Sequence, residues 1–506
     1  MSGDVEALRA AASGYGLAAL LRRSAALHAE RLAVVGSGLE LTYRDLDERS
    51  DRLASALIDR GVRRGDRVAV LSTTRPEYVE VYLAAAKLGV TVVGLNYRLH
   101  PDELAQCLTM TVPKVLFASP EHGDLLAKVA PDSLEGIVFG ETYQAALTAA
   151  GVRRILDVGE PEDIHSVVFT SGTTGRPKAA MISQRAAAVR ALRVAHWYDL
   201  GPHDGMVGWL PLYHTSVETV TATLLSGGRW ATFDTIDIPA MYAAIERYRL
   251  TWMPLLPGVF TDFMDHPART QHDLSSLRFG FGYGNMMPQA VKEFCTLFDA
   301  GFWDAYGQTE SSFLVAHGYV RPGEEPSLRK QPTPLLELRL VDEDMDDVPV
   351  EVPGECVLRG PSVMSGYLDD EAATAEAFRG GWLHTGDVLV RHDDGTVSFV
   401  DRVKYLIKTG GENVYPAEVE LVIAEHPAVR EVCVISVPDE RWGEAIKAVV
   451  VVHPDAELTA EEVRAWCKER LAGYKCPRLV GFMTAEQLPR SITGKILRDE
   501  LAGTSS

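Results

Sequence analysis

Residues 166–178 read Ser-Val-Val-Phe-Thr-Ser-Gly-Thr-Thr-Gly-Arg-Pro-Lys, an apolar strand that runs into a loop of glycine and hydroxyl side chains ending at Lys178. Glycines let backbone N–H groups approach phosphate oxygens, the hydroxyls add donors, and the lysine adds a compact positive charge. The loop lacks the Gly-Lys-Ser/Thr ending of a Walker A motif. A plain surface turn would not gather so many phosphate-binding groups directly after a strand. The stretch therefore predicts a phosphate site of another type.

Short apolar runs flank this loop in both directions. On the N-terminal side, runs such as 67–71 and 115–118 alternate with helical segments and are bounded by Gly, Pro or charged residues, a pattern typical of buried parallel strands. Between 349 and 400 the runs are separated by Gly and Asp-Gly, which favours antiparallel hairpins. Helix and strand patterns mix again after Asp401. We therefore predict an α/β fold class: a large multi-layer N-terminal α/β domain at 1–400, which includes an antiparallel β subdomain, and a small C-terminal α+β domain.

The length and charge of the chain narrow the class of protein further. A chain of 506 residues exceeds the size at which one hydrophobic core stops growing, which supports two domains. The formal net charge of −20 disfavours nucleic acid and anionic membranes as partners, because both attract positive surfaces. The six cysteines are dispersed, no signal-peptide pattern stands near Met1, and no apolar run is long enough to cross a bilayer. We therefore expect a cytoplasmic protein with no nucleic-acid partner and no integral membrane association.

A second segment with nucleotide-binding chemistry, 304–310, reads Asp-Ala-Tyr-Gly-Gln-Thr-Glu. Tyr306 offers a face for a nucleobase, Gly307 allows close backbone approach, and the Glu310 carboxylate suits Mg²⁺. Alone, this segment would be interpreted as a turn with a packed tyrosine and a solvated glutamate. Next to the phosphate loop it predicts a nucleotide site, and Asp387 has a short carboxylate suited to two ribose hydroxyls.

Eight motifs that include these segments follow one another along the chain. In this order they resemble the signature of the adenylate-forming superfamily, which includes acyl-CoA synthetases, firefly-type luciferases and peptide-synthetase adenylation domains. The resemblance covers most of the chain, and the ordered set is far more specific than any single motif. The motifs lie at 170–178, 211–214, 283–285, 306–310, 385–387, 401–402, 408–413 and 493–495.

The resemblance implies a first half-reaction in which a substrate carboxylate attacks the α-phosphorus of ATP and pyrophosphate leaves. Negative charge builds in that transition state, so a positioned cation together with Mg²⁺ would stabilise it. The implied catalytic residues are Lys495, His214, Glu310 and Thr170, and Glu310 would also hold the metal. The implied nucleotide-binding residues are Thr170, Ser171, Gly172, Thr173, Thr174, Gly175, Lys178, Gly284, Asn285, Asp304, Ala305, Tyr306, Gly307, Gln308, Thr309, Asp387 and Arg402.

The resemblance also implies a second half-reaction, in which the thiol of coenzyme A attacks the acyl-adenylate and expels AMP. The small domain, at 405–506, would be mobile and would rotate about a hinge at 401–404, with Lys404 as the hinge residue. Cys476 stands where relatives carry a basic residue. The implied coenzyme A contacts are Gly410, Gly411, Glu412, Trp442, Tyr474 and Lys475.

His214 and the residues around it indicate the class of acyl substrate. His214 corresponds to a residue that guards the acyl site in acyl-CoA synthetases, and it cannot supply the fixed negative charge that pairs with the ammonium of an amino acid. The predicted substrate pocket is largely apolar, which favours a fatty, alicyclic or aromatic acid. Its residues are Tyr213, His214, Val217, Tyr283, Met286 and Phe313.

The sequence thus predicts an AMP-forming carboxylate–CoA ligase that uses ATP, Mg²⁺ and coenzyme A. Three alternatives stay open: acyl transfer to a carrier protein, thioester formation alone from an acyl-adenylate made by a partner enzyme, and a non-catalytic nucleotide sensor. Two features of the sequence suggest the second alternative. Ala179 and Ala180 stand where relatives usually carry glycine next to the loop, and Gln184 replaces a common histidine. Intact Lys178, Glu310 and Lys495 argue for both half-reactions. A homodimer is also left open.

Overall fold

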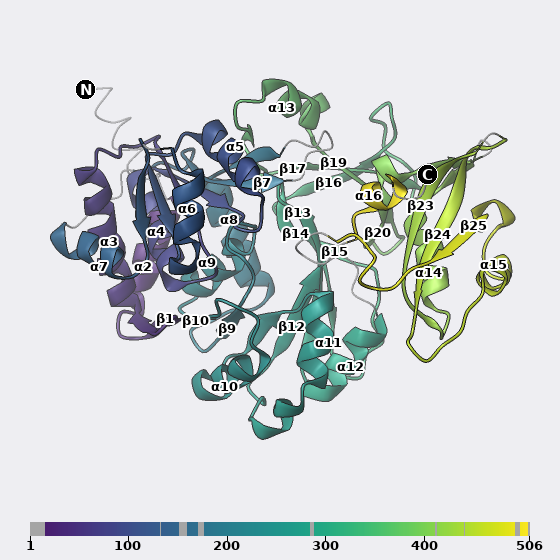
Figure 1. Cartoon of the computed structure of the whole chain (residues 1–506), viewed down its shortest axis with the longest axis horizontal. Helices are drawn as coiled ribbons and strands as arrows, with labels where there is room; N and C mark the ends of the chain where they lie inside the picture. Colours follow the sequence, from purple (N-terminus) through teal and green to yellow (C-terminus); the bar gives the residue numbers. More distant parts are fainter. Residues whose placement is uncertain are drawn as a thin grey trace. The chain divides into compact units, whose positions relative to one another are not determined.

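The chain folds into two compact units. The computed structural model describes residues 16–131, 133–150, 159–170, 177–283, 288–409, 412–439, 441–490 and 496–503. The first unit comprises 1–337 and 358–383, and the second comprises 338–357 and 384–506. Figure 1 shows the helices and strands of both.

The first unit contains two mainly parallel sheets. The nine-stranded sheet has the order β15-β14-β13-β12-β11-β9-β10-β1-β2, and its pairs from β1 to β13 are parallel. The seven-stranded sheet has the order β18-β8-β7-β4-β3-β5-β6, and its pairs from β7 to β6 are parallel. Antiparallel strands form the edges at β2, β14 and β15, and at β8 and β18.

The strands of the nine-stranded sheet are β1 (Leu32–Gly36), β2 (Leu39–Thr42), β9 (Gly205–Gly208), β10 (Arg229–Thr232), β11 (Trp252–Pro254), β12 (Phe279–Tyr283), β13 (Gly301–Gln308), β14 (Ser312–Val320) and β15 (Gln331–Pro332). Those of the seven-stranded sheet are β3 (Arg67–Leu71), β4 (Thr91–Leu95), β5 (Val115–Ala118), β6 (Glu135–Val138), β7 (Ile164–Thr170), β8 (Lys178–Ser183) and β18 (Gly366–Tyr367). The runs 67–71 and 115–118 thus form strands with the bounds expected from the sequence.

Helices pack against these sheets, and α4 (Pro76–Leu88) is buried along its whole length. It begins with a proline at the first helical position and ends at Gly89, whose φ of 65° suits glycine. The buried charges of α4 are paired: Glu80 bonds Arg49, and Lys87 bonds Asp51, each at 2.7 Å. The other helices are α2 (Leu17–Leu27), α3 (Tyr43–Asp59), α5 (Pro101–Thr111), α6 (Gly123–Val129), α7 (Glu141–Ala149), α8 (Gln184–Trp197), α9 (Val217–Leu225), α10 (Ile238–Tyr248), α11 (Pro257–Asp265), α12 (Pro288–Phe298) and α13 (Glu371–Ala377).

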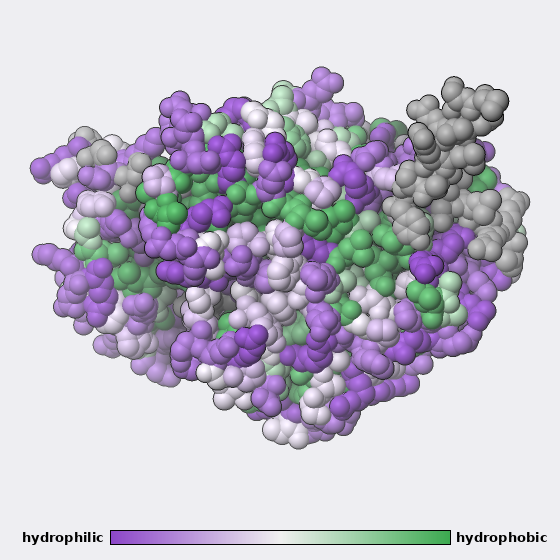
Figure 2. All heavy atoms as spheres, turned by 180° about the vertical axis from the view of Figure 1, so that it is seen from behind, coloured by the Kyte–Doolittle hydropathy of each residue, from purple (hydrophilic) through white to green (hydrophobic). Residues whose placement is uncertain are grey.

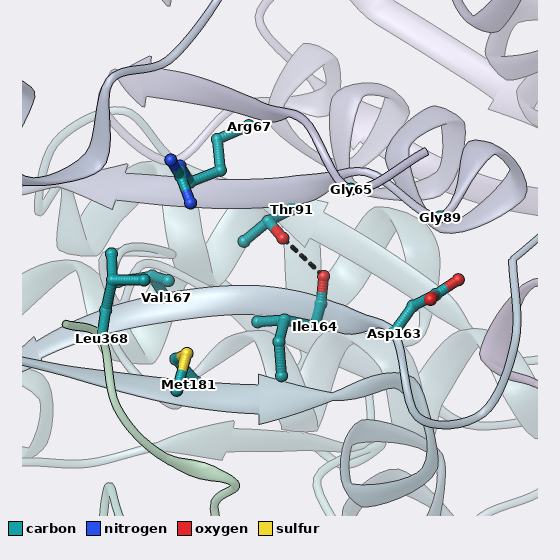
Figure 3. A pocket seen from close by; sticks show the side chains of 9 residues that line it. All are labelled: Gly65, Arg67, Gly89, Thr91, Asp163, Ile164, Val167, Met181 and Leu368. Atoms are coloured by element: carbon teal, nitrogen blue, oxygen red, sulfur yellow. Dashed lines mark hydrogen bonds between the residues drawn. The ribbon is translucent and has the colours of Figure 1, made fainter. Parts of the chain in front are cut away.

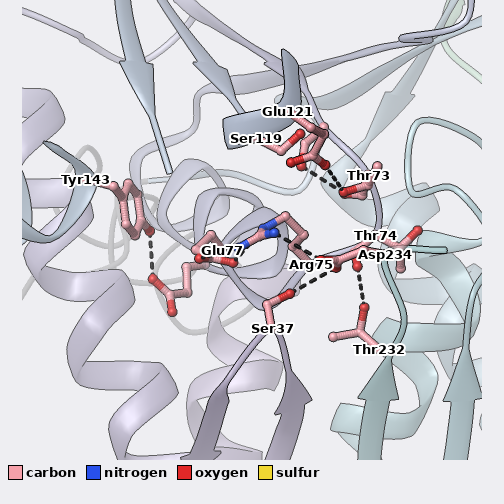
Figure 4. Close-up of polar contacts among 12 residues, drawn as sticks. Ser37, Thr73, Thr74, Arg75, Glu77, Ser119, Glu121, Tyr143, Thr232 and Asp234 are labelled. Carbon is pink, nitrogen blue, oxygen red and sulfur yellow. Dashed lines mark hydrogen bonds and ion pairs between the residues drawn. The ribbon is translucent and has the colours of Figure 1, made fainter. Parts of the chain in front are cut away.

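Polar side chains join the two sheets at the start of α4 (Figure 4). Arg75 pairs with Asp234 at 3.0 Å, and Ser37 donates to the same carboxylate at 2.9 Å. Thr232 donates to the carbonyl of Thr74 at 2.6 Å. Thr74 and Arg75 follow β3 of one sheet, whereas the other three residues lie at the ends of β1 and β10 in the other sheet. These bonds therefore fix strand ends of the two sheets to each other.

The second unit contains two smaller sheets. One has the order β16-β17-β19-β20, and the other has the order β22-β21-β24-β23 with β25 parallel to β24. Helices α14 and α15 pack on the core of the second sheet, which includes Ile407, Val434 and Val450. The elements are β16 (Glu337–Val341), β17 (Pro353–Arg359), β19 (Leu383–Arg391), β20 (Val397–Arg402), β21 (Ile407–Thr409), β22 (Glu412–Val414), β23 (Val429–Asp439), β24 (Gly443–Val452), β25 (Leu479–Phe482), α14 (Pro416–Ala424), α15 (Ala460–Lys468) and α16 (Arg498–Gly503).

The predicted fold class, with a large α/β part, an antiparallel sheet and a small α+β part, is confirmed. The compact units are divided differently from the predicted boundary at residue 400, because 338–357 and 384–400 fall in the second unit. The strands of these segments pair in the same sheet as β20, which leads directly into the C-terminal part. The hinge at 401–404 concerns motion and stays a prediction.

The surface carries apolar side chains in patches between polar ones on the face seen in Figure 2. Single exposed residues such as Leu27 and Val112 are of the kind found on most protein surfaces. Within the described part of the chain, no helix has the length and apolar character required to span a membrane.

Gly94→Ala should destabilise the first unit. A Cβ on Gly94 in β4 would lie 2.8 Å from the Cα of Tyr213 and 2.8 Å from the hydroxyl of Tyr78, so the segment around Tyr213 would have to move. Overpacking of this kind costs about 1–3 kcal/mol. Urea unfolding of the purified protein measures the change in the free energy of unfolding. Gly201→Ala, whose Cβ would meet no heavy atom within 4 Å, is the matched control; equal stability of the two variants would contradict the prediction.

Candidate active site

The ends of the predicted phosphate loop lie side by side on an antiparallel strand pair. Thr170 is the last residue of β7, Lys178 is the first of β8, and the two are direct partners across the pair. Directly opposed residues share one face of a sheet, so Thr170 and Lys178 lie on the same face. The residues between them that were predicted to bind phosphate, Ser171, Gly172, Thr173, Thr174 and Gly175, lie outside the described residues.

Tyr367 shares this face. It lies in β18 opposite Ala180 of β8, two residues from Lys178. The ammonium of Lys178 is 4.9 Å from the centroid of the Tyr367 ring. The alternate residues Ala179 and Met181 belong to the hydrophobic core on the other face of the strand. The strand therefore separates a polar face that carries Lys178 from an apolar face that holds the sheet in place.

A cavity of about 140 Å³ lies on that other face. Figure 3 shows its lining, in which the Thr91 hydroxyl donates to the carbonyl of Ile164 at 2.7 Å. Met181 is three positions from Lys178, so the two side chains point to opposite faces of β8. This cavity is therefore separate from the candidate site. Its lining consists of Gly65, Arg67, Gly89, Thr91, Asp163, Ile164, Val167, Met181 and Leu368.

Glu310 is connected to the phosphate-loop strands through Tyr367. The Tyr367 hydroxyl donates to Oε1 of Glu310 at 3.0 Å, and the backbone carbonyl of Glu310 accepts from the N–H of Met364 at 2.7 Å. Burial, and secondly the negative charge of Glu310, raise the pKa of Tyr367. The phenol therefore stays neutral and keeps its donor.

The segment before Glu310 forms the end of β13, where the backbone packs too closely for a side chain at Gly307. A Cβ on Gly307 would lie 2.2 Å from the carbonyl oxygen of Ser312, so no other residue fits there without movement. Tyr306 and Ala305 are buried, and Thr309 is half-buried in the turn. Gln308 has a buried side-chain nitrogen without a hydrogen-bond partner among the described residues, which leaves that donor for a ligand.

The Asp304 side chain has a structural role in this structure. Its carboxylate pairs with Lys330 at 2.5 Å, and both groups are buried. Burial raises the pKa of Asp304 and the Lys330 charge opposes that rise. Any contact of this residue with a nucleotide would therefore be made by its backbone or would compete with Lys330.

A buried polar network, which the sequence did not predict, holds the turn after Glu310. Ser312 donates to Glu218 at 2.6 Å, and Glu218 pairs with Arg190 at 3.0 Å. Arg190 also donates to the carbonyl of Ser362 at 2.8 Å, and the hydroxyl of Ser362 donates to the carbonyl of Ser311 at 3.0 Å. The network joins α8, α9, the start of β14 and the segment that leads to Tyr367.

The described aromatic residues of the predicted acyl pocket each pack against another ring. The Tyr213 ring lies 4.5 Å from His214 and 5.6 Å from Tyr97, centroid to centroid. Val217 is buried at the start of α9, and Phe313 packs on Phe281 at 5.7 Å.

His214 is uncharged in this setting. Burial, and secondly the Arg98 charge, lower the pKa of His214 to about 4. The imidazole is therefore neutral at physiological pH, which suits an apolar substrate. The side chain of Tyr283, together with Gly284, Asn285 and Met286, lies outside the described residues.

In the second unit, Asp387 and Arg402 occupy one strand pair. They are direct partners between β19 and β20, and Nε of Arg402 lies 2.9 Å from Oδ1 of Asp387. The preceding Gly386 has a φ of 66°, which favours glycine. The pair brings together the carboxylate and the guanidinium that the sequence assigned to the ribose.

The predicted hinge is bonded to the C-terminal helix of the same unit. Lys404 pairs with Asp499 at 3.1 Å, and Asp401 pairs with Arg498 at 3.2 Å. Asp401 also accepts the N–H of Ala417 at 2.9 Å. The hinge segment is thus tied to α14 and α16 in this conformation.

The predicted coenzyme A residues lie in different settings. Trp442 lies under two guanidinium groups, with Arg441 at 4.7 Å and Arg478 at 4.5 Å from its ring. Lys475 pairs with Glu418 at 2.5 Å, whereas Tyr474 and Glu412 are exposed. Gly410, Gly411 and Lys495, which was predicted to be catalytic, lie outside the described residues.

The oxygen ligands that the Glu310 carboxylate offers fit a magnesium ion. Within the described ranges, no group of three or more His, Cys, Asp and Glu side chains could hold a metal. Magnesium is usually bound in nucleotide sites by one or two carboxylates together with phosphate oxygens and water. The Glu310 carboxylate, close to the face that carries Lys178 and Thr170, matches that requirement.

Known proteins are similar in sequence to nearly the whole chain. The sequence matches the AMP-binding enzyme family at 21–368 and the AMP-binding enzyme C-terminal domain at 418–495. It is 36% identical to a feruloyl-CoA synthase from Amycolatopsis sp over 484 residues, which cover 95% of this chain and 97% of the relative. It is 33% identical to the indoleacetate–CoA ligase of Aromatoleum aromaticum over 494 residues, 95% and 96% of the two chains.

Solved structures agree with the sequence matches. ATP-bound MatB from Rhodopseudomonas palustris superimposes with a TM-score of 0.88 at 27% identity and covers 97% of this chain and 99% of its own. The anthranilate CoA ligase AuaEII in complex with anthranoyl-AMP gives a TM-score of 0.86 at 26% identity, with 97% and 98% covered. The chain belongs to the AMP-binding enzymes of the adenylate-forming superfamily. Within it, the chain is an acyl-CoA synthetase, an AMP-forming acid–thiol ligase that uses ATP, Mg²⁺ and coenzyme A.

The buried histidines of the first unit should make the protein less stable in mild acid. Burial lowers the pKa of His165 to about 3 and that of His317 to about 4, whereas an unfolded histidine titrates at about 6.5. In this window the unfolded chain binds more protons, so the free energy of unfolding falls as the pH falls. His165→Phe should reduce the slope of the free energy of unfolding against pH by up to about 1.4 kcal/mol per pH unit.

Urea unfolding at a series of pH values tests this dependence. His453→Phe, at an exposed position, is the control and should leave the slope unchanged. An unchanged slope in His165→Phe would show that His165 takes up protons in the folded protein.

Proposed function

We propose that this acyl-CoA synthetase activates an aromatic carboxylic acid. The observation that carries the proposal is the acyl-side wall, in which Tyr97, Tyr213 and a neutral His214 form a continuous aromatic row. Such a wall stacks on an aromatic ring and offers no fixed charge to an ammonium group. The feruloyl-CoA synthase and the indoleacetate–CoA ligase, which by their names act on aromatic acids, support the same class.

We assign the residues of the first half-reaction as follows. Thr170, Lys178 and the loop between them bind the ATP phosphates, Tyr306 lies against the adenine, and the Asp387–Arg402 pair binds the ribose. Lys495 stabilises the charge that develops as the acid attacks the α-phosphorus. Glu310 binds the magnesium ion, which neutralises phosphate charge.

We assign the second half-reaction to a rotated arrangement of the C-terminal domain. The chain turns at Lys404, and the thiol of coenzyme A then reaches the acyl-adenylate carbonyl past Gly410 and Gly411. Trp442, Tyr474 and Lys475 bind the nucleotide end of coenzyme A. Rotation would require the Lys404–Asp499 pair to adjust, and this pair is partly exposed and therefore weak. The reducing cytoplasm is the proposed compartment, supported by the dispersed positions of the six cysteines in the sequence.

The protein incubated with MgATP, coenzyme A and a panel of aromatic, alicyclic and fatty acids should release pyrophosphate and form acyl-CoA fastest with an aromatic acid. Mass spectrometry follows both products. Equal or faster turnover of a fatty acid would contradict the substrate class. Acyl-CoA formed only from supplied acyl-adenylates would show that the chain lacks the first half-reaction, and adenylate without acyl-CoA would indicate a carrier protein as acceptor.

Lys495→Ala should separate the two half-reactions. Loss of the cation removes stabilisation of the transition state of adenylation, which costs about a hundredfold in rate or more. Acyl-CoA formation from a synthetic acyl-adenylate should continue, because the thiol attacks the acyl carbon and no bond to phosphorus forms or breaks in that step. Lys468→Ala, at an exposed lysine in the last turn of α15, is the control and should retain both rates. Equal losses in both half-reactions of Lys495→Ala would contradict the assigned role.

A further inference from the structure

Tyr367 contacts two groups of opposite charge in the candidate active site. The face of its ring meets the ammonium of Lys178, and its hydroxyl donates to the carboxylate of Glu310. These two residues are assigned to the ATP phosphates and to the magnesium ion. Tyr367 itself has no assigned role in either half-reaction.

The tyrosine lies between groups that would otherwise attract each other. Among the described ion pairs, Lys178 and Glu310 are not joined directly. A direct pair would occupy the lysine that phosphate needs and the carboxylate that the metal needs, and both groups would have to be separated again before ATP binds. The ring face attracts a cation more weakly than a carboxylate does, so Lys178 can leave it for phosphate oxygens.

The ring is held in place by its backbone and its neighbours. The Tyr367 N–H donates to the hydroxyl of Thr374 at 2.9 Å, and the preceding Gly366 has a φ of 132°. A Cβ on Gly366 would lie 2.9 Å from Cγ2 of Thr374, so the turn accepts glycine only. Tyr367 is itself 8% exposed. The hydroxyl is therefore presented at a fixed position to Glu310.

We propose that Tyr367 is a positioning residue for adenylation, which orients the Glu310 carboxylate for the metal and keeps Lys178 available for the ATP phosphates. The proposal rests on the proposed function of the site. It assigns two separate roles to one side chain: the hydroxyl orients the carboxylate, and the ring holds the lysine.

Two variants separate these roles. Tyr367→Phe keeps the ring and removes the hydroxyl, so Glu310 loses its hydrogen bond and the dissociation constant of the metal should rise about tenfold, as expected for loss of a hydrogen bond to a charged group. Tyr367→Leu also removes the ring, and its affinity for the ATP analogue should fall below that of the phenylalanine variant. Tyr248→Phe, which breaks a Tyr–Glu hydrogen bond of 2.6 Å elsewhere on the surface, is the matched control.

Metal binding is measured by Mn²⁺ electron paramagnetic resonance with the non-reactive analogue α,β-methylene-ATP, and analogue affinity is measured by calorimetry. Acyl-CoA formation from a synthetic acyl-adenylate should be unchanged in Tyr367→Phe, because that step needs neither group. Wild-type metal affinity in Tyr367→Phe would overturn the role of the hydroxyl, and equal analogue affinity in the two variants would overturn the role of the ring. A loss of both half-reactions together with a lowered melting temperature would show a purely structural residue. Failure of the proposed function is recognised separately, because the wild-type protein would then form no acyl-CoA from free acid.

Discussion

The described part of the candidate active site depends on the buried ion pair between Arg190 and Glu218. The two side chains are only 2% and 5% exposed, so each has lost nearly all of its hydration. In a buried pair that loss can outweigh the mutual attraction unless further hydrogen bonds satisfy the charges. Here Ser312 and the carbonyl of Ser362 supply such bonds. Because Ser312 lies in the turn after Glu310 and Ser362 donates to the carbonyl of Ser311 in the same turn, the groups that compensate the buried charges also fix this turn.

The sequence predicted strands such as 67–71 and 115–118 with the bounds that they have in the structure, for a local reason. Apolar runs such as 67–71 must be buried, and the glycine and hydroxyl groups of 170–178 stand next to one another in the chain. The pairing of Thr170 with Lys178 then follows from a short antiparallel connection. Gly307 was predicted to allow close backbone approach, and the approaching group is the carbonyl of Ser312.

Other parts of the site could not be found in this way, since their partners lie far apart in the chain. Tyr367 and Glu310 are separated by 57 positions, and Ser312 and Glu218 by 94. Nothing in a Gly-Tyr pair of the sequence indicates such a contact, and an arginine in a helix is usually interpreted as a solvated residue. The ion pair between Asp304 and Lys330 is a contact that the motif did not reveal. A motif position suggested a ligand contact, whereas the side chain is engaged with a lysine that only the folded sheet brings near.

Ion pairs join α16 to the segment that is predicted to act as the hinge. Arg498 joins Asp401 to Glu420, at 3.2 Å and 2.6 Å, from a helix that begins three residues after Lys495. If the predicted hinge moves, α16 would have to move with it or these ion pairs would have to break. Fusion of a bulky tag to the last residues, or trimming of the tail, would slacken this linkage, so a purification handle is better attached to the other end of the polypeptide.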